Sequence, residues 1–441
     1  MTLALRLAQQ GKAVTLIEAA PYLGGVASAW RLGDVIWDRH YHVTLYSDNY
    51  LRSLLRELGL EEELRWNRAQ TGFFANSQLH SISNALEFLW FPPLNLYEKA
   101  RLGITIVKAS RIQDSTDLEK VSVEEWLETW SGKGVTRKLW LPLLRAKLGD
   151  GYRDTSAAFI WSTIARMYSA RRTGAKAEMF GYVPGGYARI LKVFEELLVR
   201  FGVTLRLGQS VRAVRRTCAG RLRVEFGRTC SEDFSRVAVT TAAPLTADIC
   251  PTLQDREKVL LRGIAYQGLI CASLLLKNPL SPFYITNIAD DRLPFTAVIE
   301  MSALVDRDQF GGKSLVYLPK YLSPASSNYG LSYSQIREDF LKALEEMHPR
   351  FNRNDVECFQ ISRVKYLLPI PTINYSASIP PFFTSIPGLY LVNSAQIVNG
   401  TLNVNETVGL AESAVRRFGD PVPVCNPNQA LFTHELAPAH S

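Results

Sequence analysis

The sequence lacks several features that would place it in well-defined classes of protein. It has only six cysteines in 441 residues, and none of them forms a C-x-x-C pair or a zinc-ligand spacing. We therefore expect scattered, reduced thiols, as in a cytoplasmic protein. It also has no Lys/Arg-rich tail, and 50 basic against 42 acidic residues leave a modest net charge of +8. This balance argues against nucleic acid as a partner.

Segments that would target the chain to a membrane are also lacking. The one long uncharged run, residues 366–405, contains five prolines and many polar residues, which a lipid-spanning helix would not tolerate. The first residues carry Arg6 in their apolar part and no small-residue cleavage site, unlike a signal peptide. We expect a cytoplasmic protein, and contact with an anionic membrane surface stays open as an alternative.

The composition that is present belongs to an ordinary globular enzyme. Hydrophobic residues make up 47% of the chain and charged residues 21%, so the chain can bury a large core. A length of 441 residues exceeds what one hydrophobic core usually serves. We therefore expect two or more domains.

The first residues contain part of a dinucleotide-binding unit. Residues 2–10 are helix formers stopped by Gly11, and the β-branched and aliphatic run 14–17 then ends in Glu18. This order is the second half of a βαβ unit, and its first strand and glycine-rich turn are missing from the sequence. Glu18 is placed to accept hydrogen bonds from ribose hydroxyls, or is a solvated carboxylate at a strand end. The glycine pair 24–25 allows a close backbone approach.

Three segments together resemble a known family. The first is E-x-x-x-x-x-G-G from Glu18, with Ser28 soon after it. The second is residues 181–214, a Pro-Gly-Gly turn followed by an amphipathic helix and a strand, and the third is residues 387–418. In this order they are similar to FAD-dependent amine oxidases, phytoene desaturases and protoporphyrinogen oxidases. The chain resembles a member that is truncated within the dinucleotide-binding motif.

The resemblance implies an α/β fold with two domains, both discontinuous in the sequence. A Rossmann-like FAD-binding domain would lack its first strand and Gly-rich loop, and a mixed sheet-and-helix domain would bind the substrate. In that domain we expect strands at 268–276, 296–300 and 314–319 and a helix at 333–347. The implied division is 1–70, 181–254 and 386–418 for FAD, 71–180 and 255–385 for substrate, and a poorly ordered tail at 419–441.

The resemblance also implies FAD as cofactor and the residues that hold it. The spacing Asn403-x-x-Glu406 predicts a helix over 404–417, and its N-terminus would stabilise negative charge on the reduced flavin. The sequence departs from the family at Val26, where relatives have Arg, and at 393–394, where they have Gly-Asp. The implied cofactor-binding residues are Glu18, Gly24, Gly25, Ser28, Val211, Ser394, Asn403 and Val404.

The segment 37–44 (WDRHYHVT) holds the most reactive cluster of side chains. Asp38, His40 and His42 alternate along an expected strand and would project from one face. Three interpretations stay open: a metal site, which we do not favour, a structural histidine pair, and acid–base chemistry. The resemblance favours His42 as the acid–base residue beside the flavin.

The aromatic-rich segment 83–110 is either core, the lining of an apolar cavity, or a surface that rests on a bilayer. The resemblance implies an oxidoreductase that moves hydride from an organic, bulky and apolar small molecule to flavin N5. Isoprenoids, amines and porphyrinogens are the candidate substrates. A UDP-galactopyranose mutase-like isomerase of a sugar nucleotide is an alternative, and a truncated, non-catalytic protein without flavin is a second one. The oligomeric state cannot be deduced from the sequence.

Overall fold

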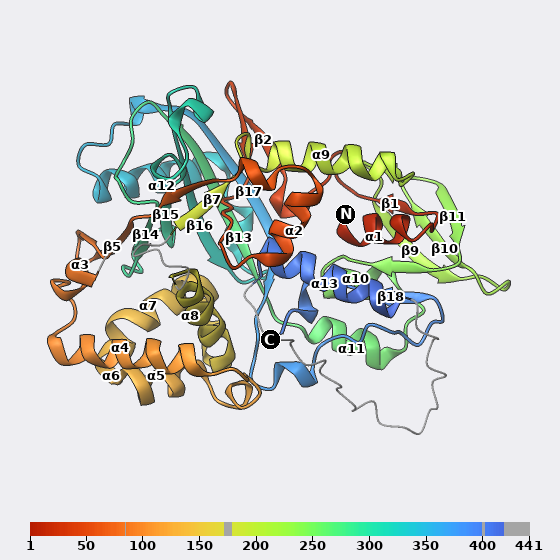
Figure 1. Ribbon diagram of the computed structural model, residues 1–441, viewed down its shortest axis with the longest axis horizontal. Coiled ribbons are helices and arrows are strands. Elements are labelled where there is room, and N and C mark those ends of the chain that lie inside the picture. The colour runs from red at the N-terminus through yellow and green to blue at the C-terminus, as the bar shows by residue number, and fades with distance from the viewer. Residues whose placement is uncertain (84, 172–178, 399–401, 419–441) are drawn as a thin grey trace.

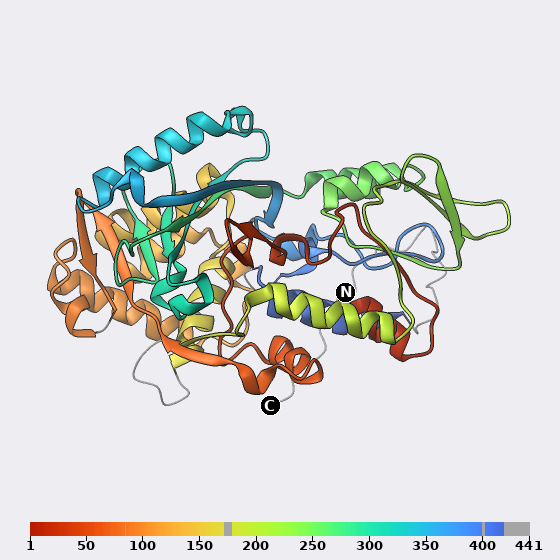
Figure 2. The same ribbon diagram turned by 90° about the horizontal axis from the view of Figure 1, so that it is seen from above.

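The computed structural model describes residues 1–83, 85–171, 179–398 and 402–418. The predicted disordered tail, 419–441, lies outside these residues, so that prediction stays untested. The molecule is elongated, and its two ends hold different kinds of structure (Figures 1 and 2). A large mixed sheet and most of the helices lie at one end, and short parallel strands with their helices lie at the other.

The N-terminal elements form in the predicted order. Helix α1 (Thr2–Gln9) leads to β1 (Thr15–Ile17), which pairs in parallel with β8 (Thr204–Arg206). Helix α9 (Gly186–Arg200) precedes β8 and turns Ile190, Phe194 and Leu198 into the core it shares with α1. The 3.6-residue spacing of these apolar side chains is what places them on one face.

A second parallel pair lies beside α13 (Val404–Arg417), which packs on α1. In it β12 (Val237–Val239) pairs with β18 (Leu389–Leu391). In the described chain no hydrogen bonds join this pair to the β1–β8 pair. Three antiparallel strands flank them: β9 (Val211–Arg216), β10 (Leu222–Phe226) and β11 (Cys230–Phe234).

The large sheet has seven strands, and all neighbours are antiparallel except β14 and β5. Its second strand, β13, is buried along its whole length, and its mostly apolar sequence suits a strand covered on both faces. Helix α12 (Tyr333–Met347) covers one face. In order, the strands are β17 (Val356–Pro369), β13 (Tyr266–Leu276), β16 (Ser314–Leu322), β15 (Ala297–Glu300), β14 (Ile285–Ile288), β5 (Thr71–Ala75) and β6 (Gln78–Ser81).

A group of helices packs below this sheet in Figure 1 around a core of its own. No helix among the described residues is long and apolar enough to cross a membrane. The helices of the group are α4 (Leu96–Arg111), α5 (Val123–Ser131), α6 (Lys133–Val135), α7 (Leu141–Leu148) and α8 (Ala157–Arg171). The other elements are α2 (Asn49–Glu57), α3 (Ala85–Leu89), α10 (Ala243–Ile249), α11 (Asp255–Gly263), β2 (Ala29–Leu32), β3 (Val35–Asp38), β4 (Arg65–Arg68) and β7 (Met179–Tyr182).

The predicted α/β class is confirmed, and so are the expected strands and helices to within a few residues. One expectation was wrong. The strand predicted through residues 37–44 ends at Asp38, and the chain then turns, apart from a single bridge at Thr44. Asp38, His40 and His42 therefore do not share one face of a strand. Our division into FAD and substrate domains stays a proposal.

Candidate functional site

The end of β1 leads into the first group of predicted cofactor residues. Glu18 accepts a hydrogen bond from the backbone N–H of Ala20 (2.9 Å), and its own carbonyl accepts from Gln209 (2.8 Å). Gln209 lies two residues before Val211, the predicted cofactor residue with which β9 begins. Gly24 has a φ of 105°, and a Cβ at this position would clash with the side chain of Leu191 on α9. Glycine is favoured here by the positive φ, and a larger residue would also have to displace the end of the Leu191 side chain.

Buried polar atoms without partners mark these loops as suited to a ligand. The Ser28 hydroxyl is 1% exposed and has no hydrogen-bond partner, and the Asn393 side-chain N–H group is in the same situation. The Tyr187 hydroxyl and the Arg39 Nε are also buried without partners. Unsatisfied buried donors are costly, and oxygen-rich groups such as phosphates and ribityl hydroxyls would satisfy them. The residues therefore fit a dinucleotide cofactor.

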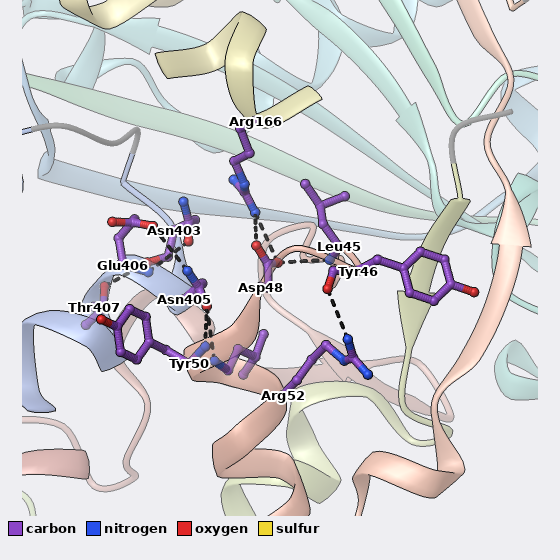
Figure 3. A network of polar contacts seen from close by, with 11 residues as sticks. Leu45, Tyr46, Asp48, Tyr50, Arg52, Arg166, Asn403, Asn405, Glu406 and Thr407 are labelled. Atoms are coloured by element: carbon purple, nitrogen blue, oxygen red, sulfur yellow. Dashed lines mark hydrogen bonds and ion pairs between the residues drawn. The ribbon is translucent and has the colours of Figure 1, made fainter. Parts of the chain in front are cut away.

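The N-terminus of α13 holds the last two predicted cofactor residues. The Asn403 side chain accepts from the N–H of Glu406 (3.0 Å), so it caps the helix that starts at Val404, as predicted. Two residues further on, the Asn405 side-chain oxygen accepts from the N–H groups of Tyr50 (2.9 Å) and Leu51 (3.1 Å) (Figure 3). The first turn of α13 is thereby fixed to the first turn of α2.

A buried ion pair continues this network into the helix group (Figure 3). Asp48, whose side chain is 3% exposed, accepts two hydrogen bonds from Arg166 of α8 (2.9 and 3.1 Å). Its second oxygen also accepts from the N–H of Leu45 (2.9 Å). Because these contacts occupy the carboxylate, Asp48 makes no side-chain cap to α2, which it precedes. Asn405 takes that role.

In segment 37–44 the carboxyl group of Asp38 and the imidazoles of His40 and His42 are uncharged near pH 7, beside the charged Arg39. Burial raises the pKa of Asp38 to about 8, although its oxygen accepts a 2.7 Å hydrogen bond from the N–H of Tyr187, which lowers the pKa in turn. Burial lowers the pKa of His40 and of His42 to about 4. A neutral acid and two neutral imidazoles lie in this region, which is the environment of a dry site.

The two histidines have different surroundings. His40 is 6% exposed, and its ring nitrogens contact the carbonyl of Val26 (2.9 Å) and the hydroxyl of Ser362 (3.0 Å), so it is a satisfied structural residue. The His42 Nδ1 lies 3.0 Å from the carbonyl of His40, and its ring lies 4.9 Å from that of Tyr187. A carbonyl only accepts, so Nδ1 carries the proton and Nε2 is the acceptor of a neutral His42. Among the described residues no cluster of side chains suited to a metal occurs.

A cavity of about 810 Å³ lies where the large sheet, the helix group and α10–α11 meet. Tyr266 lines it, and the Tyr266 hydroxyl bonds the N–H of Ala243 (3.1 Å) and the side chain of Ser394. The cavity wall is therefore in direct contact with a predicted cofactor residue. The lining also contains Gln267, a residue that is 2% exposed and whose Nε2 has no partner.

Comparison with known proteins agrees with this geometry. The model of the flavin-containing amine oxidoreductases matches residues 1–404. The chain belongs to this family. It is thus an FAD-dependent oxidoreductase, and its fold is the Rossmann-like one of that class. No sequence match to a curated protein was found.

Solved structures share this flavin amine oxidoreductase fold along nearly the whole chain. A putative protoporphyrinogen oxidase from Exiguobacterium sp. 255-15 is 18% identical, with a TM-score of 0.73 and coverage of 95% of this chain and 96% of that one. A reduced UDP-galactopyranose mutase is 14% identical (TM-score 0.71, coverage 95% and 92%). Putrescine oxidase bound to putrescine is 16% identical (TM-score 0.68, coverage 94% and 96%). Because the sequence identities are this low, the comparison shows a shared fold and does not show a shared substrate.

Several polar residues in and around this candidate site were not identified from the sequence. Asn393, Asn405 and Gln267 act through burial and through contacts with residues far away in the chain. Asn405 carried one usable signal, since a second Asn within the first turn of a capped helix is unusual for a solvated position. The partner of Asp48, Arg166, lies 118 residues away, and no local pattern connects them.

Proposed function

We propose that this flavin oxidoreductase removes hydride from a bulky, mainly apolar organic molecule and delivers it to N5 of FAD. The cavity of about 810 Å³ is the observation that carries the proposal, because its volume suits a molecule much larger than a simple alkyl amine. When bound, FAD supplies the two-electron acceptor. Isoprenoids and porphyrinogens fit this description better than small amines do.

The walls of the cavity support an apolar body for the substrate. Tyr266 and Tyr366 present rings whose centroids are 5.6 Å apart in an edge-to-face arrangement. The three charged members of the lining are exposed: Asp248 and Arg262 pair with each other (3.1 Å), and Asp150 is the third. The remaining apolar lining consists of Leu148, Pro244, Ile264, Ala265, Pro324 and Ile370.

The protein's part in the reaction would be to bind, orient and exclude water. The residues that would hold FAD are Glu18, Gly24, Gly25, Ser28, Val211, Ser394, Asn403 and Val404. His42 would accept a proton at Nε2, because the carbonyl of His40 keeps the proton on Nδ1. A histidine pKa of about 4 makes it a weak base that is neutral at pH 7.

The test is anaerobic mixing of the FAD-loaded protein with an isoprenoid, a porphyrinogen or putrescine. We expect the visible absorbance of oxidised flavin to disappear with a bulky apolar compound and to persist with putrescine. The exposed Ala265 lines the cavity, so Ala265→Trp should raise the KM for the bulky substrate by about tenfold or more. Ala219→Trp, at an exposed turn between β9 and β10, is the matched control. Bleaching by putrescine alone would refute the proposal.

A second candidate function is the isomerisation of a sugar nucleotide. The observation in its favour is Lys147 of α7, whose ammonium lies over the ring of Phe159 (5.8 Å) and has no carboxylate partner in the described chain. Burial, and then the charge of Arg166, lower the pKa of Lys147. A diphosphate would compensate the charge of Lys147. Micromolar UDP binding that Lys147→Met abolishes would favour this function over hydride removal.

A further inference from the structure

Helices α3 and α4, at the left of Figure 1, carry a set of exposed apolar side chains, which we call the apolar stripe. Trp90 is 80% exposed, and Leu96 and Tyr97 are each 70% exposed. Single exposed hydrophobic residues are common, but here six of them fall within residues 89–107, along α3, the turn that follows, and α4. The stripe consists of Leu89, Trp90, Leu96, Tyr97, Ile104 and Val107.

Helix α4 is apolar on two faces, and only one of them is covered. Leu102, Thr105 and Ala109 are buried against the helix group. Residues 96, 97, 100, 104 and 107 recur at helical spacing on the other side and are exposed. A helix with a free apolar face needs a surface to cover it.

Within the segment that carries the stripe, residues 87–111, the exposed charges have one sign. Glu98 is 8% exposed and turned inward to Lys138 (2.8 Å) and the N–H of Asn95, and Glu87 accepts from Ser81 and Ser83. No carboxylate between residues 87 and 111 is therefore free at the surface. The cations of α4 are Lys99, Arg101, Lys108 and Arg111.

We propose that the apolar stripe binds the surface of a membrane that contains anionic lipids. Trp90 and Tyr97 are the side chains that prefer the interface between headgroups and acyl chains, and Leu96 and Ile104 would enter the acyl boundary. Lys108 and Arg111 would then face the anionic headgroups. A second copy of this chain is a poorer occupant, because it would place like cations against each other.

The experiment measures co-sedimentation of the full protein with vesicles. One set contains phosphatidylcholine alone and the other phosphatidylcholine mixed with phosphatidylglycerol. We expect binding to the mixed vesicles that weakens at high salt. The double variant W90S/Y97S should bind about tenfold or more weakly. K108E/R111E should lose the preference for the anionic vesicles by a similar factor. The matched control, V199S/V259S, removes two exposed valines on α9 and α11 and should bind like the unaltered protein.

All six positions are exposed, so the thermal unfolding temperatures should stay unchanged, which separates loss of binding from misfolding. Brominated phosphatidylglycerol gives a second measurement, since it should quench tryptophan fluorescence less in Trp90→Phe than in the unaltered protein. The proposal is overturned if the unaltered protein ignores both kinds of vesicle, or if the control loses as much binding as the stripe variant. It is also overturned if W90S/Y97S alters only the self-association of the protein, measured without lipid, and leaves its binding to vesicles unchanged.

Discussion

Asn405 offers a sharp test of how the α13 turn is held. Its side-chain oxygen accepts from the N–H groups of Tyr50 and Leu51, 355 and 354 residues away, at the start of α2. Those groups have no partner within their own helix, as in any first turn. Asp48 does not serve them, since its oxygens are bonded to Arg166 and Leu45. Replacing Asn405 by Ala removes the only side chain that caps α2 among the described residues.

The expected loss follows from these contacts. Loss of a capping side chain costs about 1 kcal/mol, and a buried N–H left without a partner costs about 1–3 kcal/mol. Leu51 is buried, whereas water can reach Tyr50 in part. Asn405→Ala should therefore lower the free energy of unfolding by about 2–4 kcal/mol. Asn405→Asp keeps an acceptor but loses the 3.1 Å bond to Glu406, so we expect about half that loss.

The assay combines urea unfolding with hydrogen exchange of residues 49–57. Faster exchange in α2, together with the lower stability, would locate the effect at the helix start. Asn278→Ala, at an exposed side chain with one long bond to Asp355, is the matched control and should change little. If Asn405→Ala unfolds at the same urea concentration as the unaltered protein and α2 exchanges at the same rate, the capping argument is wrong.

Three further predictions follow from buried or closely packed residues. Burial lowers the pKa of His348 from 6.5 in the unfolded chain to about 4 in the folded protein. As the pH falls from 6.5 to 4, the unfolded state therefore takes up the proton first, and the free energy of unfolding decreases. In His348→Leu the slope of the unfolding free energy over that range should be shallower by about 1.4 kcal/mol per pH unit; an unchanged slope contradicts the burial argument. Gly186→Ala places a Cβ 2.7 Å from the Asp38 oxygen at a φ of 61°, whereas Gly11→Ala meets open space at a φ of 76°. Thermal unfolding should show a larger loss for the first, by about 1–3 kcal/mol, and equal losses would be unexpected. Gln267→Met removes a buried donor that has no partner, so the thermal stability should stay the same or rise. The KM for an oxygen-bearing substrate should rise about tenfold. A fall in thermal stability would show that the amide has a structural partner.

Local patterns predicted the elements well where spacing alone determines them. Helix 404–417 with its Asn403 cap and helix 333–347 have the predicted bounds, because capping residues and a 3.6-residue apolar period act within one element. The strand predicted at 268–276 is also present, as β13 (Tyr266–Leu276). The family and its cofactor likewise followed from motifs whose residues lie close together in the chain.

Segment 37–44 was predicted wrongly because its side chains are placed by distant partners. Asp38 accepts from an amide at the start of α9, and His40 lies between Val26 and Ser362, 14 and 322 residues away. These bonds, and the turn after β3, outweigh the alternation that suggested a strand. The neutral states of Asp38 and His40 follow from the same burial and could not be deduced from the sequence.

The sequence by itself determined the order of helices and strands, the α/β class, the family resemblance and the residues expected around FAD. Each of these depends on neighbours within a few positions along the chain. Only the tertiary structure decided which polar atoms are buried without partners, that Asn405 caps α2, and that an apolar face of α4 stays uncovered. Burial and long-range contacts are properties of the packed chain, and a residue carries no local mark of whether a distant element will cover it.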